Sequence, residues 1–145
     1  MNKKILIACI GFILLFSFWF YTKHPLSAKV TINKTEFIVD LAITQKEKST
    51  GLSFRKPLQP RRGMLFVYEH KDIYAFWMKD MNFPLDFIWI DGAVIVDITK
   101  NVSPADAMDM HVVKPNVPVN KILEINAGEI DTYNIQIGDT VMFNK

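Results

Sequence analysis

The sequence FIWIDGAVIVDI, residues 87–98, contains two apolar runs separated by an Asp91-Gly92 pair. Asp-Gly between apolar runs is the strongest short signal for a β-hairpin, because a type I′ turn needs positive φ at both central residues. The segment therefore predicts two antiparallel strands joined by a tight turn.

Further short apolar runs flank this hairpin on both sides. Apolar and polar side chains alternate with period two over residues 30–32 and 37–43, which is typical of half-buried strands. The other runs lie at residues 64–68, 73–78, 122–125 and 135–143. Pro, Gly and Asp-Gly turn signals separate them, which favours a mainly β fold, a single antiparallel sandwich or barrel, over alternating β and α units.

One short helix interrupts this pattern. Thr44-Gln45-Lys46-Glu47 has the sequence of a capping box, in which the Thr44 hydroxyl and the Glu47 carboxylate each satisfy an otherwise unpaired amide. Gly51 can end the helix after about two turns. We expect one or two short helices in the whole domain.

The length of 145 residues suits one globular domain. Of 17 Lys+Arg and 15 Asp+Glu, three lysines flank the first apolar stretch, which leaves 14 basic and 15 acidic groups in residues 29–145. Nucleic-acid binding needs a basic surface that neutralises phosphates. The nearly neutral body argues against a nucleic-acid partner.

The first 28 residues form a separate segment. Residues 5–21 are uncharged and apolar, between Lys3-Lys4 and Lys23. A helix of that length spans roughly 25 Å, just enough to cross a membrane with lysines at both ends. Both a signal anchor and a cleaved signal peptide fit. In either case residues 29–145 are expected outside the cytoplasm, held at the cell membrane by residues 5–21, or secreted if the signal is cleaved.

Cys9, within the apolar run, is the single cysteine. The body therefore has no disulfide framework, thiolate metal site or cysteine nucleophile. Met108, Met110 and His111 present soft donors of the kind that favour Cu(I), but methionines also fill gaps beneath long connections. We prefer the packing role and expect no metal and no cofactor.

Four motifs occur in order along the body: Thr50-Gly51-Leu52, Gly63-Met64-Leu65-Phe66, Phe76-Trp77-Met78-Lys79 and Pro84-Leu85-Asp86. With these motifs the chain resembles, over about residues 30–143, the domain of unknown function 192 family of small exported or membrane-tethered prokaryotic proteins. Ser53 departs from this pattern, as does Asp80-Met81. The resemblance implies a compact, mostly β fold and no established reaction.

Candidate site residues concentrate in residues 76–91, where aromatic and charged side chains alternate. Trp77 could stack on a sugar or another flat ligand while Asp86 and Arg55 form hydrogen bonds to it, as in an apolar pocket with few polar groups. Alternatively, these aromatic residues form the core, and Asp86 caps a turn or pairs with Arg55. Lys79 and Glu124 complete the set of candidate ligand-binding residues.

Three functions remain open from the sequence. The first is a non-catalytic binding or accessory module of the cell envelope, for a small molecule such as a saccharide. The second is an envelope hydrolase in which Asp86 and Glu124 converge on one bond, although the chain has none of the common catalytic motifs. The third is a structural partner in an envelope complex, which would show an exposed apolar patch.

Overall fold

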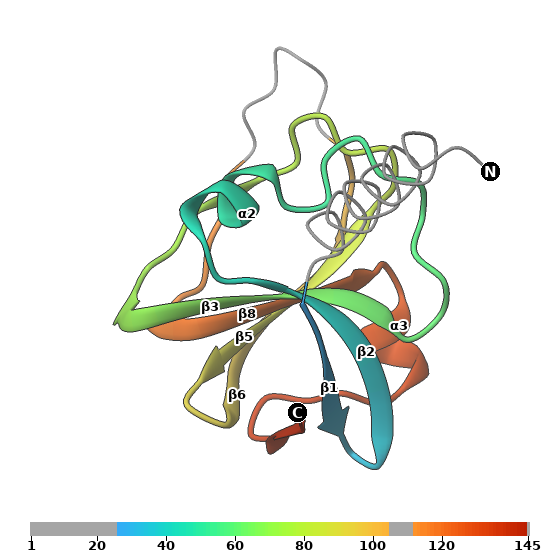
Figure 1. Cartoon of the computed structure of the whole chain (residues 1–145). Coiled ribbons are helices and arrows are strands. Elements are labelled where there is room, and N and C mark those ends of the chain that lie inside the picture. The colour runs from blue at the N-terminus through green and yellow to red at the C-terminus, as the bar shows by residue number, and fades with distance from the viewer. Residues whose placement is uncertain (1–25, 105–111, 145) are drawn as a thin grey trace, which may run out of the picture.

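The structure is a computed structural model that describes residues 26–104 and 112–144. It is mainly β, with 52% of the described residues in strands, which confirms the mainly β class; the predicted sandwich or barrel is replaced by a curled half-barrel. The main sheet curls into a half-barrel, and two short helices pack against it (Figure 1). The helices are α2 (Gln45–Thr50) and α3 (Glu129–Thr132).

Seven strands form the main sheet in the order β6-β5-β8-β3-β2-β1-β9. Their bounds are β1 (Ser27–Ile32), β2 (Thr35–Ala42), β3 (Arg62–Asp72), β5 (Leu85–Asp91), β6 (Val94–Val102), β8 (Val119–Asn126) and β9 (Val141–Asn144). A separate two-stranded sheet pairs β4 (Phe76–Trp77) with β7 (Val112–Val113). The runs at 73–78 and 135–143 therefore form much shorter strands than the sequence predicts.

The hairpin at residues 87–98 is present as β5 and β6. Asp91 pairs with Val94, so the two loop residues are Gly92 and Ala93, one position later than predicted. Gly92 has φ +62°, but Ala93 does not have a positive φ, so the turn lacks the second positive φ of the predicted type I′ turn. The Asp-Gly signal thus identifies the hairpin correctly and misplaces its turn by one residue.

The prediction that the sheet is antiparallel is wrong for one pair of strands. β2 and β3 are parallel, with Asp40 opposite Met64, while the other strand pairs are antiparallel. A parallel pair needs a long crossover connection, and residues 43–61, which contain α2, provide it. The capping box is confirmed: the Glu47 amide donates to Thr44 Oγ1, and the Thr44 amide donates to Glu47 Oε2.

The two edges of the curled sheet meet at one end. Val94 in β6 forms an isolated bridge with Thr140, next to β9. The Ile95 amide donates to Asp139 O over 3.0 Å, and the Val141 amide donates to Ala93 O over 2.8 Å. These bonds satisfy edge groups that would otherwise be free to pair with another chain.

Apolar side chains cover both faces of the sheet. The inner face encloses one core, with members Val30, Ile32, Phe37, Val39, Leu65, Ile88, Ile90, Ile95, Leu123, Ile125, Ile130, Ile135 and Val141. The outer face carries a second core, with members Ala42, Leu52, Met64, Phe66, Met78, Phe83, Leu85, Phe87, Trp89, Val113, Val119 and Ile122. This second core brings the segment that contains α2 and the β4–β7 sheet onto the sheet, and the candidate site lies beneath them.

Among residues 26–104 and 112–144, no helix is long and apolar enough to cross a bilayer. The apolar run 5–21 lies outside the described residues, and so does the group formed by Met108, Met110 and His111.

Candidate functional site

A row of side chains crosses the outer face of the sheet. Asp40 in β2 lies opposite Met64 in β3, Met64 lies opposite Glu124 in β8, and Glu124 lies opposite Phe87 in β5. Residues that lie directly opposite each other project from the same face of a sheet. The register therefore places two carboxyl groups, those of Asp40 and Glu124, on the face that α2 covers.

Glu124 is the buried polar group of this row. Its residue is 5% exposed, and the described groups that act on its pKa are its burial and the charge of Arg55, with no hydrogen bond among them. Burial raises the pKa of Glu124 to about 8, and the nearby positive charge of Arg55 opposes part of this rise. Without a partner the carboxyl is therefore mostly protonated at neutral pH.

A cavity of about 80 Å³ adjoins Glu124. Its aromatic wall consists of Phe66 and Tyr68, two residues apart in β3, together with Phe76 and Trp77 of β4. The rest of the wall comes from the C-terminal half of α2, the residues that follow it, and Ala75, Met78, Met81 and Leu85. We call this cavity with its lining the Glu124 pocket.

The aromatic rings of the Glu124 pocket hold one another in place. The rings of Phe66 and Phe76 meet edge to face, with centroids 4.9 Å apart, and Tyr68 stacks on Tyr74 with centroids 3.6 Å apart. Burial raises the pKa of Tyr68 to about 12, so the phenol stays neutral. The Lys48 ammonium of α2 lies 4.1 Å from the Tyr68 ring centroid, a cation–π distance.

Arg55 pairs with Asp40, not with Asp86 as the sequence suggests. Arg55 Nη1 lies 2.6 Å from Asp40 Oδ2, and both side chains are partly buried. The Asn82 side-chain amide donates to Arg55 O over 3.0 Å and fixes the backbone that carries the guanidinium. The pair therefore lies on the outer face, close enough to Glu124 to influence its pKa.

Two loops meet beside the pocket in a strained conformation. Phe54 has φ +62° and Asp80 has φ +59°; the left-handed region is rare for a bulky residue such as Phe54, whereas aspartate adopts it more readily. The Phe54 amide donates to Asp80 O over 2.8 Å, and the Ser53 hydroxyl donates to Lys79 O over 3.1 Å. Strain of this kind often occurs at functional sites.

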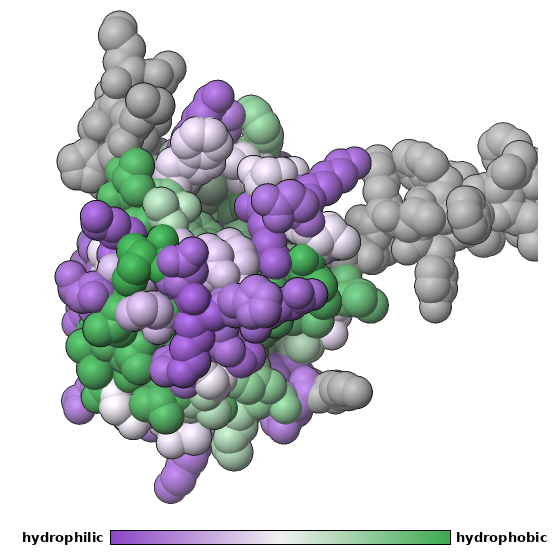
Figure 2. Space-filling view, turned by 90° about the vertical axis from the view of Figure 1, so that its left-hand side faces the viewer, coloured by the Kyte–Doolittle hydropathy of each residue, from purple (hydrophilic) through white to green (hydrophobic). Residues whose placement is uncertain are grey.

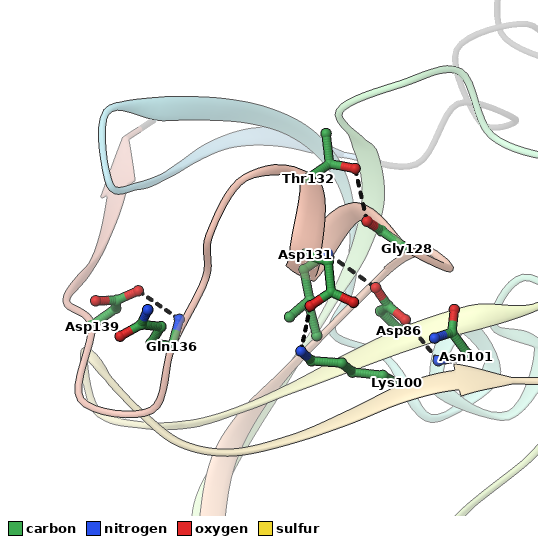
Figure 3. Close-up of polar contacts among 9 residues, drawn as sticks. Asp86, Lys100, Asn101, Gly128, Asp131, Thr132, Gln136 and Asp139 are labelled. Atoms are coloured by element: carbon green, nitrogen blue, oxygen red, sulfur yellow. Dashed lines mark hydrogen bonds and ion pairs between the residues drawn. The ribbon is translucent and has the colours of Figure 1, made fainter.

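Asp86 lies on the inner face of the sheet. It pairs with Ile125 in the register, one position from the Phe87–Glu124 pair, so its side chain projects away from the Glu124 pocket. Asp86 is fully buried and accepts the amides of Asn101 and Ile130 over 2.8 and 3.0 Å (Figure 3). These bonds make it a structural carboxylate, so the structure does not bring Asp86 and Glu124 together on one bond.

A second buried carboxyl, Glu129, differs from Glu124 in its partners. Its Oε1 accepts the Arg61 amide over 2.9 Å, while Oε2 is buried without a hydrogen-bond partner among the described residues. Burial raises its pKa. Glu129 begins α3 and supports the backbone of Arg61, and we assign it a structural role.

The side of the molecule that lies on the left in Figure 1 faces the viewer in Figure 2. Hydrophilic side chains gather in the middle of this side, between separate hydrophobic patches.

Trp77 is 55% exposed, and the Lys79 ammonium lies 5.8 Å from its ring centroid. Trp77 thus lines the Glu124 pocket while much of its surface remains open to solvent.

A comparison with protein families matches residues 28–143 to DUF192, whose description is "Uncharacterized ACR". The chain belongs to the DUF192 family. No curated protein matches it significantly.

Two crystal structures resemble the DUF192 domain described above. One is a protein from Sinorhizobium meliloti 1021 described as a candidate transcription regulator, with a TM-score of 0.77 and 25% identity over 83% of this chain and 95% of that one. The other is a protein of unknown function from Novosphingobium aromaticivorans, with a TM-score of 0.70 and 30% identity over 81% of this chain and 84% of that one. Both support the DUF192 fold, and neither assigns a reaction.

Of the five residues that the sequence singles out in this DUF192 domain, three gather near the pocket: Trp77 and Glu124 in its lining and Arg55 close to Glu124. Lys79 lies beside Trp77, and Asp86 lies on the other face. Asp40, which pairs with Arg55, and the wall residues of β3 are site residues that the sequence did not predict. In the strand that contains Asp40, apolar and polar residues alternate, and Asp40 is one of the polar residues. That alternation is the one sequence signal that could have identified Asp40 as a site residue.

Proposed function

We propose that this DUF192 domain is a non-catalytic binding module whose small ligand enters the Glu124 pocket. One observation carries the proposal: a buried carboxyl that no described residue satisfies adjoins a cavity. Buried polar groups nearly always have a hydrogen-bond partner, so a ligand that supplies one gains affinity from it.

The pocket wall supports this function. Binding sites are commonly apolar and aromatic clefts with a few polar groups that orient the ligand. Here the aromatic wall is apolar, and the carboxyl of Glu124 is the polar group. Trp77 at the exposed side offers a ring face on which the remainder of a ligand, a saccharide ring for example, can stack.

The place of action is part of the same proposal. The uncharged run 5–21 between lysines supports a single-pass membrane anchor or a signal, with the DUF192 domain at the outer face of the cell membrane. The Sinorhizobium relative is described as a candidate transcription regulator. We do not propose that role for this chain, because residues 29–145 contain 14 basic and 15 acidic groups, and a surface that is nearly neutral attracts DNA phosphates weakly.

One observation favours a second candidate, a carboxyl-dependent enzyme. A pKa of about 8 keeps the proton of Glu124 available near neutral pH, as a general acid requires. Such an enzyme would depend on Glu124 without Asp86, since the two side chains project from opposite faces of the sheet. Turnover of a bound compound that stops in Glu124→Gln would identify this activity.

The test is thermal unfolding of the full chain with a panel of saccharides, cell-wall fragments, amines and metal ions. A ligand at 100 times its Kd stabilises the folded state by about 2.7 kcal/mol, which is a shift of a few degrees. We expect the shift to shrink in Glu124→Gln and in Trp77→Ala. Glu36→Gln, at an exposed glutamate of β2, is the matched control. A shift that both pocket variants retain in full would contradict the proposed site.

A further inference from the structure

We infer that the group bound next to Glu124 is an alkylammonium, so that the ligand is an organic cation. This inference rests on the proposed binding function and defines the chemical class of its ligand. Its basis is the combination of one buried carboxyl, which no residue among 26–104 and 112–144 is seen to bind, and four aromatic residues around a single cavity.

An organic cation satisfies both parts of this lining. The face of an aromatic ring carries partial negative charge and attracts ammonium groups, most strongly when water is excluded. Phe66, Tyr68, Phe76 and Trp77 all contribute to the wall, and Glu124 contributes a full negative charge once it is ionised. An anionic ligand would instead face repulsion from that carboxylate.

The chain already places its own ammonium groups against two of these rings. Lys48 Nζ lies 4.1 Å from the ring centroid of Tyr68, and Lys79 Nζ lies 5.8 Å from that of Trp77. Lys48 is partly buried and lines the Glu124 pocket, whereas Lys79 is exposed and is not part of the lining. Tyr68 already has Tyr74 stacked on it at 3.6 Å and the Lys48 ammonium over it, so Trp77, which is 55% exposed, is the ring that an ammonium group approaching from solvent reaches first.

The charged groups around Glu124 come from β2, from the segment after α2 and from α2 itself. Arg55 is the cation near Glu124, and its guanidinium is bound to Asp40 at 2.6 Å. Tyr68 also faces Glu124, as a neutral phenol, and Lys48 of α2 lies over its ring. With Glu124 ionised, the group formed by Asp40, Arg55 and Glu124 carries a net charge of −1, and Lys48 is the further cation in the pocket wall. An ammonium bound in the cavity would place a positive charge next to the Glu124 carboxylate itself.

The size of the cavity fits a head group. A volume of about 80 Å³ corresponds to roughly half a dozen water molecules, since one water needs about 10–15 Å³ of such space. That space admits a methylammonium or trimethylammonium group and leaves the rest of a larger ligand outside, near Trp77.

Binding of a cation requires the ionised carboxylate, so it is coupled to loss of a proton from Glu124. In the free protein the pKa of Glu124 is about 8. Affinity should therefore fall about tenfold for each pH unit below that value and level off above it.

The experiment compares choline with 3,3-dimethylbutan-1-ol, which has the same shape without the charge, on the full chain in a nonionic detergent. Calorimetric titration gives Kd at pH 6, 7 and 9, and ¹³C NMR of the labelled glutamate carboxyls gives the pKa of Glu124. We expect choline to bind about a hundredfold more tightly at pH 9 than at pH 6 and to lower the pKa of Glu124. The neutral compound should produce neither effect.

Glu124→Gln provides the matched variant, since a neutral amide resembles the protonated carboxyl in shape and leaves the pocket wall intact. It should bind choline at least tenfold more weakly at pH 9 and without pH dependence, while Glu36→Gln behaves like the wild type. Equal binding of the two compounds, or tighter binding at low pH, would contradict the inference that the ligand is a cation, but it would not contradict the proposed binding function. If neither compound binds, the cation is again overturned, and the thermal-shift panel decides the binding function separately.

Discussion

At the scale of single residues, Glu124 links the charge state of the pocket to the stability of the fold. Its pKa is about 8 in the folded protein, against a usual value of 4.5. A raised pKa means that the folded state binds the proton more strongly than the unfolded chain does. The stability that Glu124 contributes is therefore fully present below about pH 4.5 and is lost as the pH rises through about 8.

We predict that Glu124→Gln removes this loss. The variant should match the wild type near pH 5 and exceed its free energy of unfolding at pH 9 by an amount on the order of a few kcal/mol, because a buried amide carries no charge. Urea denaturation at both pH values measures the difference. Glu36→Gln, in the exposed pair with Lys29, is expected to follow the wild type. Identical pH profiles for wild type and Glu124→Gln would contradict the burial of this carboxyl.

The site was only partly predictable at this scale. Trp77 and Glu124 were predicted as site residues because an indole ring can stack on a ligand and a carboxyl group can bind one. Residue type alone does not show on which face of the sheet a side chain lies. Asp86 was singled out on the same grounds, yet its side chain points to the inner face, because residues in a strand alternate. Deciding between Asp86 and Glu124 requires the register between β5 and β8, which neither strand specifies alone when both faces are buried.

At the scale of secondary-structure elements, α2 closes the Glu124 pocket, and its capping box holds it there. We predict that Thr44→Ala costs about 1 kcal/mol, since it removes the hydroxyl that accepts the Glu47 amide. Because Lys48 and the residues after it line the pocket, probe affinity should also fall. Thr44→Ser keeps the hydroxyl and is expected to retain both properties. Stability and affinity are measured by urea denaturation and calorimetry, and a loss of equal size in both variants would exclude the cap as the cause.

The contact between β3 and β8 depends on Gly63. A Cβ atom at this position would lie 2.5 Å from the Glu124 backbone oxygen, closer than side chains tolerate. We predict that Gly63→Ala destabilises the domain by about 1–3 kcal/mol, as overpacking does, and displaces β8 at Glu124. Urea denaturation measures the cost, and the ¹³C shift of Glu124 reports the displacement.

Gly92→Asn is the control for this prediction. Gly92 has φ +62°, which asparagine tolerates, and an added Cβ meets nothing within 4 Å. We expect a change within about 0.5 kcal/mol for this variant. If Gly63→Ala cost no more than Gly92→Asn, the close contact of the strands would not constrain the site.

At the scale of the whole molecule, the features set by neighbouring residues could be predicted from the sequence, whereas the pairing of distant strands could not. The hairpin of β5 and β6 and the cap of α2 follow from neighbouring residues, and both were predicted. The parallel pairing of β2 with β3 was not, because it depends on where the crossover of residues 43–61 returns. Closure of the half-barrel also joins distant segments, through the Val94–Thr140 bridge. Such contacts leave no periodic pattern in the sequence.

Asp86 ties several of these elements together from inside the half-barrel. From β5 it accepts the Asn101 amide of β6 and the Ile130 amide of α3 (Figure 3). Nearby, Lys100 of β6 forms an ion pair with Asp131 of α3. Hydrogen bonds to a charged group contribute about 1.5–3 kcal/mol each. Its loss should therefore loosen the whole fold and leave the chemistry of the Glu124 pocket unchanged, since that pocket lies on the other face.

We predict that Asp86→Ala lowers the free energy of unfolding by about 3–5 kcal/mol, because two buried amides lose their acceptor. Asp86→Asn keeps one acceptor but turns an NH₂ group toward the second amide, so its cost should be smaller but still measurable. Urea denaturation ranks the two variants. At a temperature where both remain folded, calorimetry should find ligand affinity in the Glu124 pocket unchanged. A loss of binding in folded Asp86→Asn would show that Asp86 belongs to the site after all, and would restore the two-carboxyl hydrolase as a hypothesis.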